Sequence, residues 1–238
     1  MTPRLEWRGV RKGFGGKPVL DGLDLAAETG RSLVVIGGSG QGKSVALKIA
    51  AGLMSADAGE VLLDGRPLPP NAGHARRYGL LFQGAALFDS LTVWENVAFR
   101  LLHADRLPRS AARARALDAM ARVRLPEETA SLRPDALSGG MQKRVGLARA
   151  IVAEPEILFF DEPTTGLDPV TARVIDDLIV EQVRRLGCTA VSITHDLASA
   201  RRIADDVAML HGGRIVWRGA AADLDRSGNP HVEAFVAP

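Results

Sequence analysis

One glycine-rich loop limits the folds open to this chain more than any other feature. The run Gly37-Gly38-Ser39-Gly40-Gln41-Gly42-Lys43-Ser44 fits the pattern G-x-x-x-x-G-K-[ST]. It follows the apolar segment Leu33–Ile36, which is typical of a strand buried on both faces, and it precedes a helical pattern from Lys43 to about Leu53. A strand, this loop and a helix in succession predict a phosphate-binding loop in an α/β domain with a parallel core sheet.

Each part of the loop has a chemical reason. Glycines let successive backbone N–H groups turn toward one anion, and the helix that follows adds the positive end of its dipole. We expect Lys43 to reach the terminal phosphates as a point charge, and the Ser44 hydroxyl to bind Mg²⁺. The alternative is a glycine-rich turn that only feeds the helix. The candidate phosphate-binding residues are Gly37, Gly38, Ser39, Gly40, Gln41, Gly42, Lys43, Ser44 and Val45.

The composition is that of an ordinary folded domain. Of 238 residues, 46% are hydrophobic and 24% charged, close to the average for globular proteins. This length predicts one large domain or two small ones. The 30 basic and 28 acidic residues leave a net charge of +2, which is too small for a protein that coats nucleic acid.

Cysteine and lysine are both scarce. The single cysteine, Cys188, excludes an internal disulfide, and its apolar neighbours predict a buried thiol. No apolar stretch of the signal-peptide or membrane-spanning kind is present, so we expect a cytoplasmic protein that reaches a membrane only through a partner. Lysine and arginine are not equivalent at phosphate or carboxylate sites, so each lysine matters. The lysines are Lys12, Lys17, Lys43, Lys48 and Lys143.

The pattern along the chain is mixed α/β. Short strands are predicted over residues 3–36, with turns at Gly15–Gly16 and Asp21–Gly22. A helical pattern from Thr92 to Val152 predicts a helical insertion at about 90–150. Beyond it, apolar strands and helices alternate, and a short polar tail occupies 219–238. Further strands are predicted at 61–65, 78–82, 157–160, 189–193, 207–210 and 215–217, and further helices from 168 and at 196–204.

Arginines gather within the predicted helical region, and acidic residues lie among and beside them. A membrane or nucleic-acid patch is one interpretation, but mixed charge favours an exposed helix face. The arginines are Arg106, Arg109, Arg113, Arg115, Arg122 and Arg124.

Two carboxylates follow a buried strand. The apolar segment Ile157–Phe160 leads directly to Asp161 and Glu162. In open α/β sheets, ligands lie at the carboxyl ends of strands. We therefore expect Asp161 to hold Mg²⁺ and Glu162 to accept a proton from an attacking water. The alternative is a pair of capping residues for the next helix.

A third motif, Leu137-Ser138-Gly139-Gly140-Met141-Gln142, lies between the loop and the acidic pair. Ser138 and the two glycines open a helix, whose unpaired N–H groups favour an anion. In this order, the three motifs resemble the nucleotide-binding domain of ABC (ATP-binding cassette) transporters. The resemblance covers essentially the whole chain. It implies a P-loop NTPase fold of the ABC type, 1–238, with an N-terminal antiparallel β subdomain, a parallel core sheet and an inserted helical subdomain.

The resemblance also implies roles for single residues. Ser138, Gly139 and Gly140 would cover the γ-phosphate of an ATP bound by a second copy, so that a homodimer encloses two Mg-ATP. Gln83 would sense Mg²⁺ and the attacking water, and His195 would contact the γ-phosphate and hold the catalytic glutamate. Asp168 would cross the dimer interface, although helix capping is an alternative. The implied catalytic residues are Glu162, His195 and Gln83, and the implied metal ligands are Ser44, Gln83 and Asp161.

An aromatic ring is implied for the adenine. Phe14 precedes the first turn and would stack on the base, and Trp7 is a nearby alternative. Any aromatic face can serve this purpose.

The resemblance implies an ATPase that drives a membrane permease from the cytoplasmic face of the inner membrane. Residues 37–45, 81–98 and 141–145 are most similar to the lipid-trafficking Mla and Mce-type branch, which implies phospholipid or another hydrophobic substrate and a periplasmic Mce-type partner. Apolar residues after Gln83 would line the permease groove, or pack in the core: Ala85, Ala86, Leu87 and Phe88. The alternatives are a small-solute importer, such as one for amino acids, and an ABC-type ATPase that acts on nucleic acid or ribosomes, which the near-neutral charge disfavours.

Overall fold

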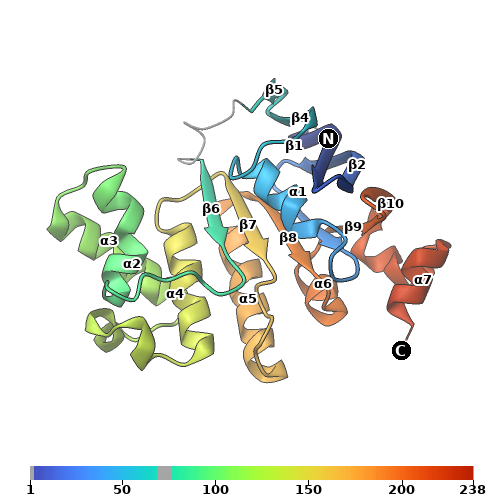
Figure 1. Ribbon diagram of the computed structural model, residues 1–238. Helices are drawn as coiled ribbons and strands as arrows, with labels where there is room; N and C mark the ends of the chain where they lie inside the picture. Colours follow the sequence, from blue (N-terminus) through green and yellow to red (C-terminus); the bar gives the residue numbers. More distant parts are fainter. Residues whose placement is uncertain (1–2, 69–76, 238) are drawn as a thin grey trace. The chain divides into compact units, whose positions relative to one another are not determined.

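The computed structural model describes residues 3–68 and 77–237, which fall into two compact units (Figure 1). The first unit is Met1–Ala75 together with Gly187–Pro238, and the second is Arg76–Leu186. The predicted helical insertion at about 90–150 lies within the second unit. That unit is wider than the prediction because it also contains two strands and a long helix.

An antiparallel sheet is built from the N-terminal strands of the first unit. Strands β1 and β2 form a hairpin that turns at Gly15–Gly16, as predicted. Each of them has 12 residues, so the expectation of short strands is wrong. In the order β2-β1-β4-β5, the sheet contains β2 (Lys17–Glu28), β1 (Pro3–Phe14), β4 (Ala58–Leu63) and β5 (Arg66–Pro67).

The predicted turn at Asp21–Gly22 is also wrong, because these residues lie inside β2. Val10 pairs with Leu23 whereas Arg11 pairs with Asp21, so Gly22 is an extra residue opposite β1. Its φ of 76° suits such a β-bulge. The bulge shifts the alternation of buried and exposed residues along β2 by one position. In the sequence, this break in the alternation, together with Asp-Gly, looks like a turn.

Parallel strands form the other layer of the first unit. Strand β3 (Ser32–Ile36) is parallel to both β8 (Thr189–Thr194) and β9 (Asp206–His211). Strand β10 (Arg214–Ala220) pairs antiparallel with β9, so the strands predicted at 207–210 and 215–217 are both present and form a hairpin. All residues of β3 and β8 are buried, as their continuous apolar runs predict. Cys188, just before β8, is buried as expected, and burial raises the pKa of its thiol to about 11.

Helix α1 (Lys43–Ala50) follows β3 and ends earlier than the predicted Leu53. Gly52 has a φ of 69°, and its N–H donates to the carbonyl of Ile49. The N–H of Leu53 reaches back to the carbonyl of Lys48. A left-handed glycine with these bonds is a Schellman-type helix end, so the apolar residues after Ala50 are outside the helix.

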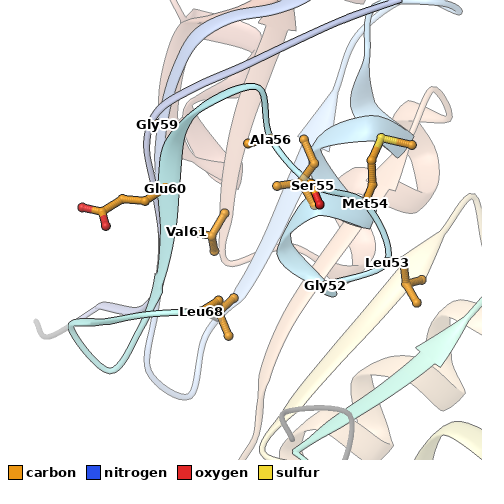
Figure 2. Close-up of a pocket in the computed structure, with 10 residues that line it drawn as sticks. Gly52, Leu53, Met54, Ser55, Ala56, Gly59, Glu60, Val61 and Leu68 are labelled. Atoms are coloured by element: carbon orange, nitrogen blue, oxygen red, sulfur yellow. The ribbon is translucent and has the colours of Figure 1, made fainter. Parts of the chain in front are cut away.

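A cavity of about 360 Å³ lies between the end of α1 and strand β4 (Figure 2). Its lining includes the apolar residues Leu53, Met54, Val61 and Leu68. None of the residues that line it is a predicted site residue, so the candidate site is elsewhere.

The predicted tail at 219–238 is folded against its own unit. A 3-10 helix, η4 (Ala221–Arg226), and a short helix, α7 (Pro230–Val236), follow β10. Leu224 and Val232 are fully buried, and the Asn229 side chain caps α7 and donates to the carbonyl of Val216. Two apolar anchors and one cap therefore order a segment whose composition is mostly polar. Helix α6 (Leu197–Ile203) also belongs to this unit.

The second unit combines a parallel pair of strands with helices. Strands β6 (Tyr78–Leu81) and β7 (Ile157–Asp161) pair in parallel, and α2, α3 and α4 gather beside them (Figure 1). Helix α2 begins with a capping box formed by Thr92 and Glu95. The helices are α2 (Val93–His103), α3 (Arg109–Arg122), α4 (Gly139–Ile151), α5 (Pro169–Leu186), η2 (Glu127–Ser131) and η3 (Pro134–Ala136).

Two glycines let α4 approach β6 very closely. A Cβ on Gly79 would collide with the backbone carbonyl of Ala150. A Cβ on Gly146 would lie 2.6 Å from a methyl group of Leu81. Side chains at these positions would hold the helix away from the strand, so small residues fix its position.

The arginine cluster is exposed as expected at every position except Arg122. Helix α3 buries the small residues Ala112, Ala116 and Ala119, and its arginines at 109, 113 and 115 are exposed. Arg122, at the end of the helix, differs: its side chain is only 14% exposed and pairs with Asp118. Arg109 pairs with Glu95, and Arg124 pairs with Glu181. Among residues 3–68 and 77–237, no helix is both long and apolar enough to cross a membrane.

Candidate functional site

The glycine loop connects β3 to α1 in the first unit. Gly37, Gly40 and Gly42 have φ values of 151°, 78° and 96°, which side-chain-bearing residues rarely adopt. Two of them also have no room for a side chain. A Cβ on Gly37 would collide with the carbonyl of Leu210, and one on Gly42 would lie 3.0 Å from atoms of Val19 and Leu20.

Lys43 is buried at the base of this loop. Its ammonium donates to the carbonyls of Gly37 at 2.7 Å and Gly38 at 3.0 Å. The Gln41 side chain accepts from the backbone N–H of Gly212 at 2.9 Å, which ties the loop to the β9–β10 turn. The loop is therefore held around a buried cation, at the start of a helix whose dipole favours an anion.

The two aromatic candidates have different environments. Phe14 ends β1 and is 48% exposed, and the Lys12 ammonium lies 5.6 Å from its ring centre. Trp7 is 2% exposed and donates its ring N–H to the carbonyl of Ala46 at 3.0 Å. A ring enclosed in this way cannot stack on a base, so the Trp7 alternative is wrong and Phe14 remains the candidate.

We expect Phe14→Ala to weaken ATP binding by roughly 1–3 kcal/mol, the usual contribution of one base–aromatic stack. Phe14→Tyr keeps the ring face and should bind as the original does. Titration with a fluorescent ATP analogue measures both dissociation constants. Equal affinities for Phe14→Ala and the unchanged protein would show that the adenine lies elsewhere.

The acidic pair lies at the carboxyl end of β7 in the second unit. Asp161 is 6% exposed and Glu162 is 8% exposed. The Thr165 hydroxyl donates to a carboxylate oxygen of Glu162 at 3.0 Å. Glu162 has a φ of 49°, a conformation that costs energy for a residue other than glycine. Buried carboxylates on a strained turn are typical of a site that binds a cation or moves a proton.

Gln83 follows β6 and is exposed. After it, Ala85 and Ala86 have positive φ values of 59° and 48°, and the Arg149 guanidinium donates to both of their carbonyls. Ala85 is buried in the core, whereas Phe88 is 44% exposed and stacks on Phe99 with ring centres 4.5 Å apart. The apolar run after Gln83 is thus divided between the core and an exposed surface.

The third motif forms the N-terminus of α4. Ser138 is the N-cap residue, and its hydroxyl accepts from the N–H of Met141 at 3.3 Å. The Gln142 side chain donates to the carbonyl of Leu137 and so fixes the chain before the helix. Gly139 is exposed, and Gly140 packs against Thr171. The helix therefore presents its positive end with little side-chain cover.

Asp168 and His195 follow the expected elements. The Asp168 carboxylate accepts from the N–H groups of Val170 and Thr171, each at 3.0 Å, and caps α5. Hydrogen bonds from Thr171 and Val170 lower its pKa. His195 is exposed after β8, and the adjacent Asp196 caps α6. The capping alternative is therefore right for Asp168, and α6 is capped by Asp196 rather than by His195.

Lys143 is a residue of this region that the sequence motifs do not reveal. Its buried ammonium donates to the carbonyls of Gln83 and Glu162, so three predicted elements of the second unit meet at one side chain. Burial lowers the pKa of Lys143, and the charges of Asp161 and Glu162 partly oppose this effect. The signals in the sequence are the scarcity of lysine and the place of Lys143 in the segment 141–145, directly after the Leu137–Gln142 motif.

The donors predicted for a metal ion suit Mg²⁺. Ser44 offers a hydroxyl, Gln83 an amide oxygen and Asp161 a buried carboxylate, and Mg²⁺ prefers such oxygen ligands together with phosphate. Within the described part of the chain, no group of three His, Cys, Asp or Glu residues could hold a metal by itself. A small number of protein ligands is what a phosphate-bound Mg²⁺ needs.

The glycine loop and the fold define a nucleotide-binding protein of the P-loop class. The profile of the ABC transporter family matches residues 20–165. The chain belongs to this family, as an ATP-binding subunit of the ATPase type.

Curated relatives match along nearly all of the chain. Protein TRIGALACTOSYLDIACYLGLYCEROL 3, chloroplastic, of Arabidopsis thaliana is 39% identical, over 97% of this chain and 72% of that protein. The spermidine/putrescine import protein PotA of Shigella flexneri is 36% identical, over 100% of this chain and 62% of that protein. The methionine import protein MetN of Caulobacter vibrioides is 41% identical, over 88% and 64%. The chain thus spans less than two thirds of these two importers.

Solved structures confirm the predicted fold class. The dimeric post-hydrolysis state of the ATP-binding cassette MJ0796, bound to ADP and Pi, has a TM-score of 0.83 and 30% identity, over 91% of this chain and 98% of that one. The cbiO1 protein of Clostridium perfringens, part of the cbiONQ transporter complex, has a TM-score of 0.85 and 28% identity, over 95% and 92%. The fold is that of ABC ATPases, with an antiparallel β subdomain and a parallel sheet with helices.

Proposed function

We propose that this chain hydrolyses Mg-ATP to drive a membrane permease. The observation that carries the proposal is the glycine loop closed around the buried Lys43, in a chain that also has the Ser138-capped helix. The loop offers backbone N–H groups and a cation to the phosphates of one ATP. The N-terminus of α4 offers a second positive end, which suits the γ-phosphate of an ATP held by another copy. A homodimer around two ATP follows from this division.

We assign chemical roles to the residues on this basis. Ser44, Gln83 and Asp161 would hold Mg²⁺, which neutralises phosphate charge when it is bound. Glu162 acts as the general base, because its buried carboxylate can take the proton of a water. His195 would orient the γ-phosphate, and Asp168, beyond its capping role, would lie at the dimer interface. Phe14 would stack on the adenine.

The transported substrate is a separate proposal. The names of PotA and MetN describe import of spermidine or putrescine and of methionine, which favours a small-solute importer for this chain. The lipid prediction rests on motif resemblance, and one relative carries the name of a glycerolipid. We therefore place small-solute import first and Mla/Mce-type lipid transport, with a periplasmic Mce-type partner, second. In both cases the protein would lie at the cytoplasmic face of the membrane, bound to the permease.

Purification in mild detergent from native membranes, followed by mass spectrometry of proteins and lipids, tests these proposals. We expect a permease to co-purify. A soluble solute receptor would support small-solute import, whereas bound phospholipid with an Mce-type protein would support lipid transport. Absence of any permease would contradict the transport proposal.

Phe88 provides a sharper form of the same test. Its ring is exposed on the segment after Gln83, which suits contact with an apolar partner. We expect Phe88→Glu to lower the amount of co-purified permease at least about tenfold, because a buried unpaired charge costs several kcal/mol. The affinity of this variant for ATP should not change. The exposed Leu53, which follows α1 in the first unit, supplies the control substitution Leu53→Glu. Equal permease recovery with Phe88→Glu would place the docking surface elsewhere.

A further inference from the structure

Lys143 is a buried cation for which no motif accounts. It lies in the second turn of α4 and is 5% exposed. Taking an ammonium out of water is costly unless it finds charge and hydrogen-bond partners. Its partners should therefore reveal why lysine stands at this position.

Those partners are two backbone carbonyls. The ammonium donates to the carbonyl of Gln83 in a short contact and to the carbonyl of Glu162 at 3.4 Å. Gln83 follows β6 and Glu162 follows β7, so one side chain joins the ends of both strands. The two residues bonded in this way are those proposed to sense the attacking water and to deprotonate it.

The surrounding charges match this placement. The carboxylates of Asp161 and Glu162 attract the ammonium, and both are buried. Charge attraction and two carbonyl bonds together offset part of the loss of hydration. An apolar side chain of similar size would leave the two carbonyls without a donor.

The other cations of α4 bond to different places. Arg144 donates to the carbonyl of Arg124 at 3.0 Å, on the exposed side of the helix. Arg149 donates to the carbonyls of Ala85 and Ala86, beyond Gln83. Lys143 thus differs from its neighbours in bonding to both proposed catalytic residues.

We propose that Lys143 is a positioning residue for hydrolysis, which fixes the backbone of Gln83 relative to that of Glu162. The inference rests on the proposed ATPase function. It extends that function because Lys143 belongs to the helix that begins at Gly139, next to the N-cap Ser138. The side chain therefore links the helix proposed to meet the second ATP with both groups that act on the water.

Two substitutions separate the hydrogen bonds from the charge. Lys143→Met fills a similar volume without donors, and Lys143→Gln keeps an N–H donor without the charge. We expect Lys143→Met to lower kcat by about 10–100-fold, since loss of alignment of roughly 1 Å can cost that much. The dissociation constant for a fluorescent ATP analogue should change by less than about twofold, because ground-state binding does not need this alignment. Lys143→Gln should recover part of the lost kcat.

Arg144→Met is the matched control. It removes a cation and a backbone hydrogen bond from the same helix, and we expect its kcat to remain within about twofold of the original. Thermal unfolding of all three variants shows whether each one folds. Hydrogen–deuterium exchange of the peptides around Gln83 and Glu162, without nucleotide, gives a readout that does not depend on turnover. We expect faster exchange in both peptides for Lys143→Met and no change for Arg144→Met.

The outcomes distinguish the inference from the function on which it rests. An unchanged kcat for Lys143→Met, an equal loss in Arg144→Met, or unchanged exchange around Gln83 would overturn the role of Lys143 alone. A loss of ATP affinity that parallels the loss of kcat would also overturn it. If the unchanged protein binds ATP but does not hydrolyse it in the presence of its permease, the proposed ATPase function fails.

Discussion

We expect Glu162→Gln to lower ATP turnover by about 10²–10⁴-fold, the usual contribution of a general base. The substitution keeps the shape of the side chain and an oxygen that can accept from the Thr165 hydroxyl. It removes the group that can take a proton from water. ATP binding should survive, because the loop around Lys43 is unaltered.

Phosphate release and binding of a fluorescent ATP analogue measure the two properties separately. Glu156→Gln is the control, because it makes the same chemical change outside the site. Glu156 precedes β7, is exposed and pairs with Arg77. Its turnover should equal that of the unchanged protein. Normal turnover by Glu162→Gln would remove Glu162 from the mechanism.

The second large effect is expected for Gly139→Asp. Gly139 is exposed at the start of α4. Outside the adjacent residues and the helix's own backbone, a Cβ there would meet only a methyl group of Leu167, at 3.8 Å, so a side chain fits. An aspartate in the first turn should also favour the helix itself. The new charge would face the position proposed for the γ-phosphate of the second copy. We therefore expect each subunit to bind ATP normally but ATP-driven dimers to be lost.

Light scattering with Mg-ATP measures this assembly best in the Glu162→Gln background, where ATP persists. Gly139→Asn has nearly the same size without the charge and serves as the control. We expect dimers with Asn and at least about tenfold weaker association with Asp, as like charges in a closed interface cost several kcal/mol. Dimers that form equally well with both residues would contradict a role for this helix end in holding the phosphate.

The local parts of the site follow from the sequence because neighbouring residues determine them. The loop at 37–44 needs only a strand before it, glycines within it and a helix after it. The Ser138 and Asp168 caps likewise depend on N–H groups two or three residues away. These features could be predicted without knowledge of distant contacts.

The remaining parts depend on residues far apart in the chain. Trp7 is unavailable for a ligand because its N–H reaches Ala46, and Lys143 acquires meaning only where Gln83 and Glu162 meet it. The bulge at Gly22 shows the same limit, because only the register with β1 distinguishes it from a turn. Contacts between residues far apart in the chain determine these three features, and a local sequence pattern does not contain those contacts.

The bare backbone contact between α4 and β6 has a mechanical consequence. Where Gly79 lies against Ala150, no compressible layer of side chains separates helix from strand. A displacement of the N-terminus of such a helix is therefore transmitted directly to the strand. The segment that follows the strand then moves together with the helix. Larger residues at Gly79 or Gly146 would separate α4 from β6 and weaken this coupling, although neither position is one of the proposed catalytic residues.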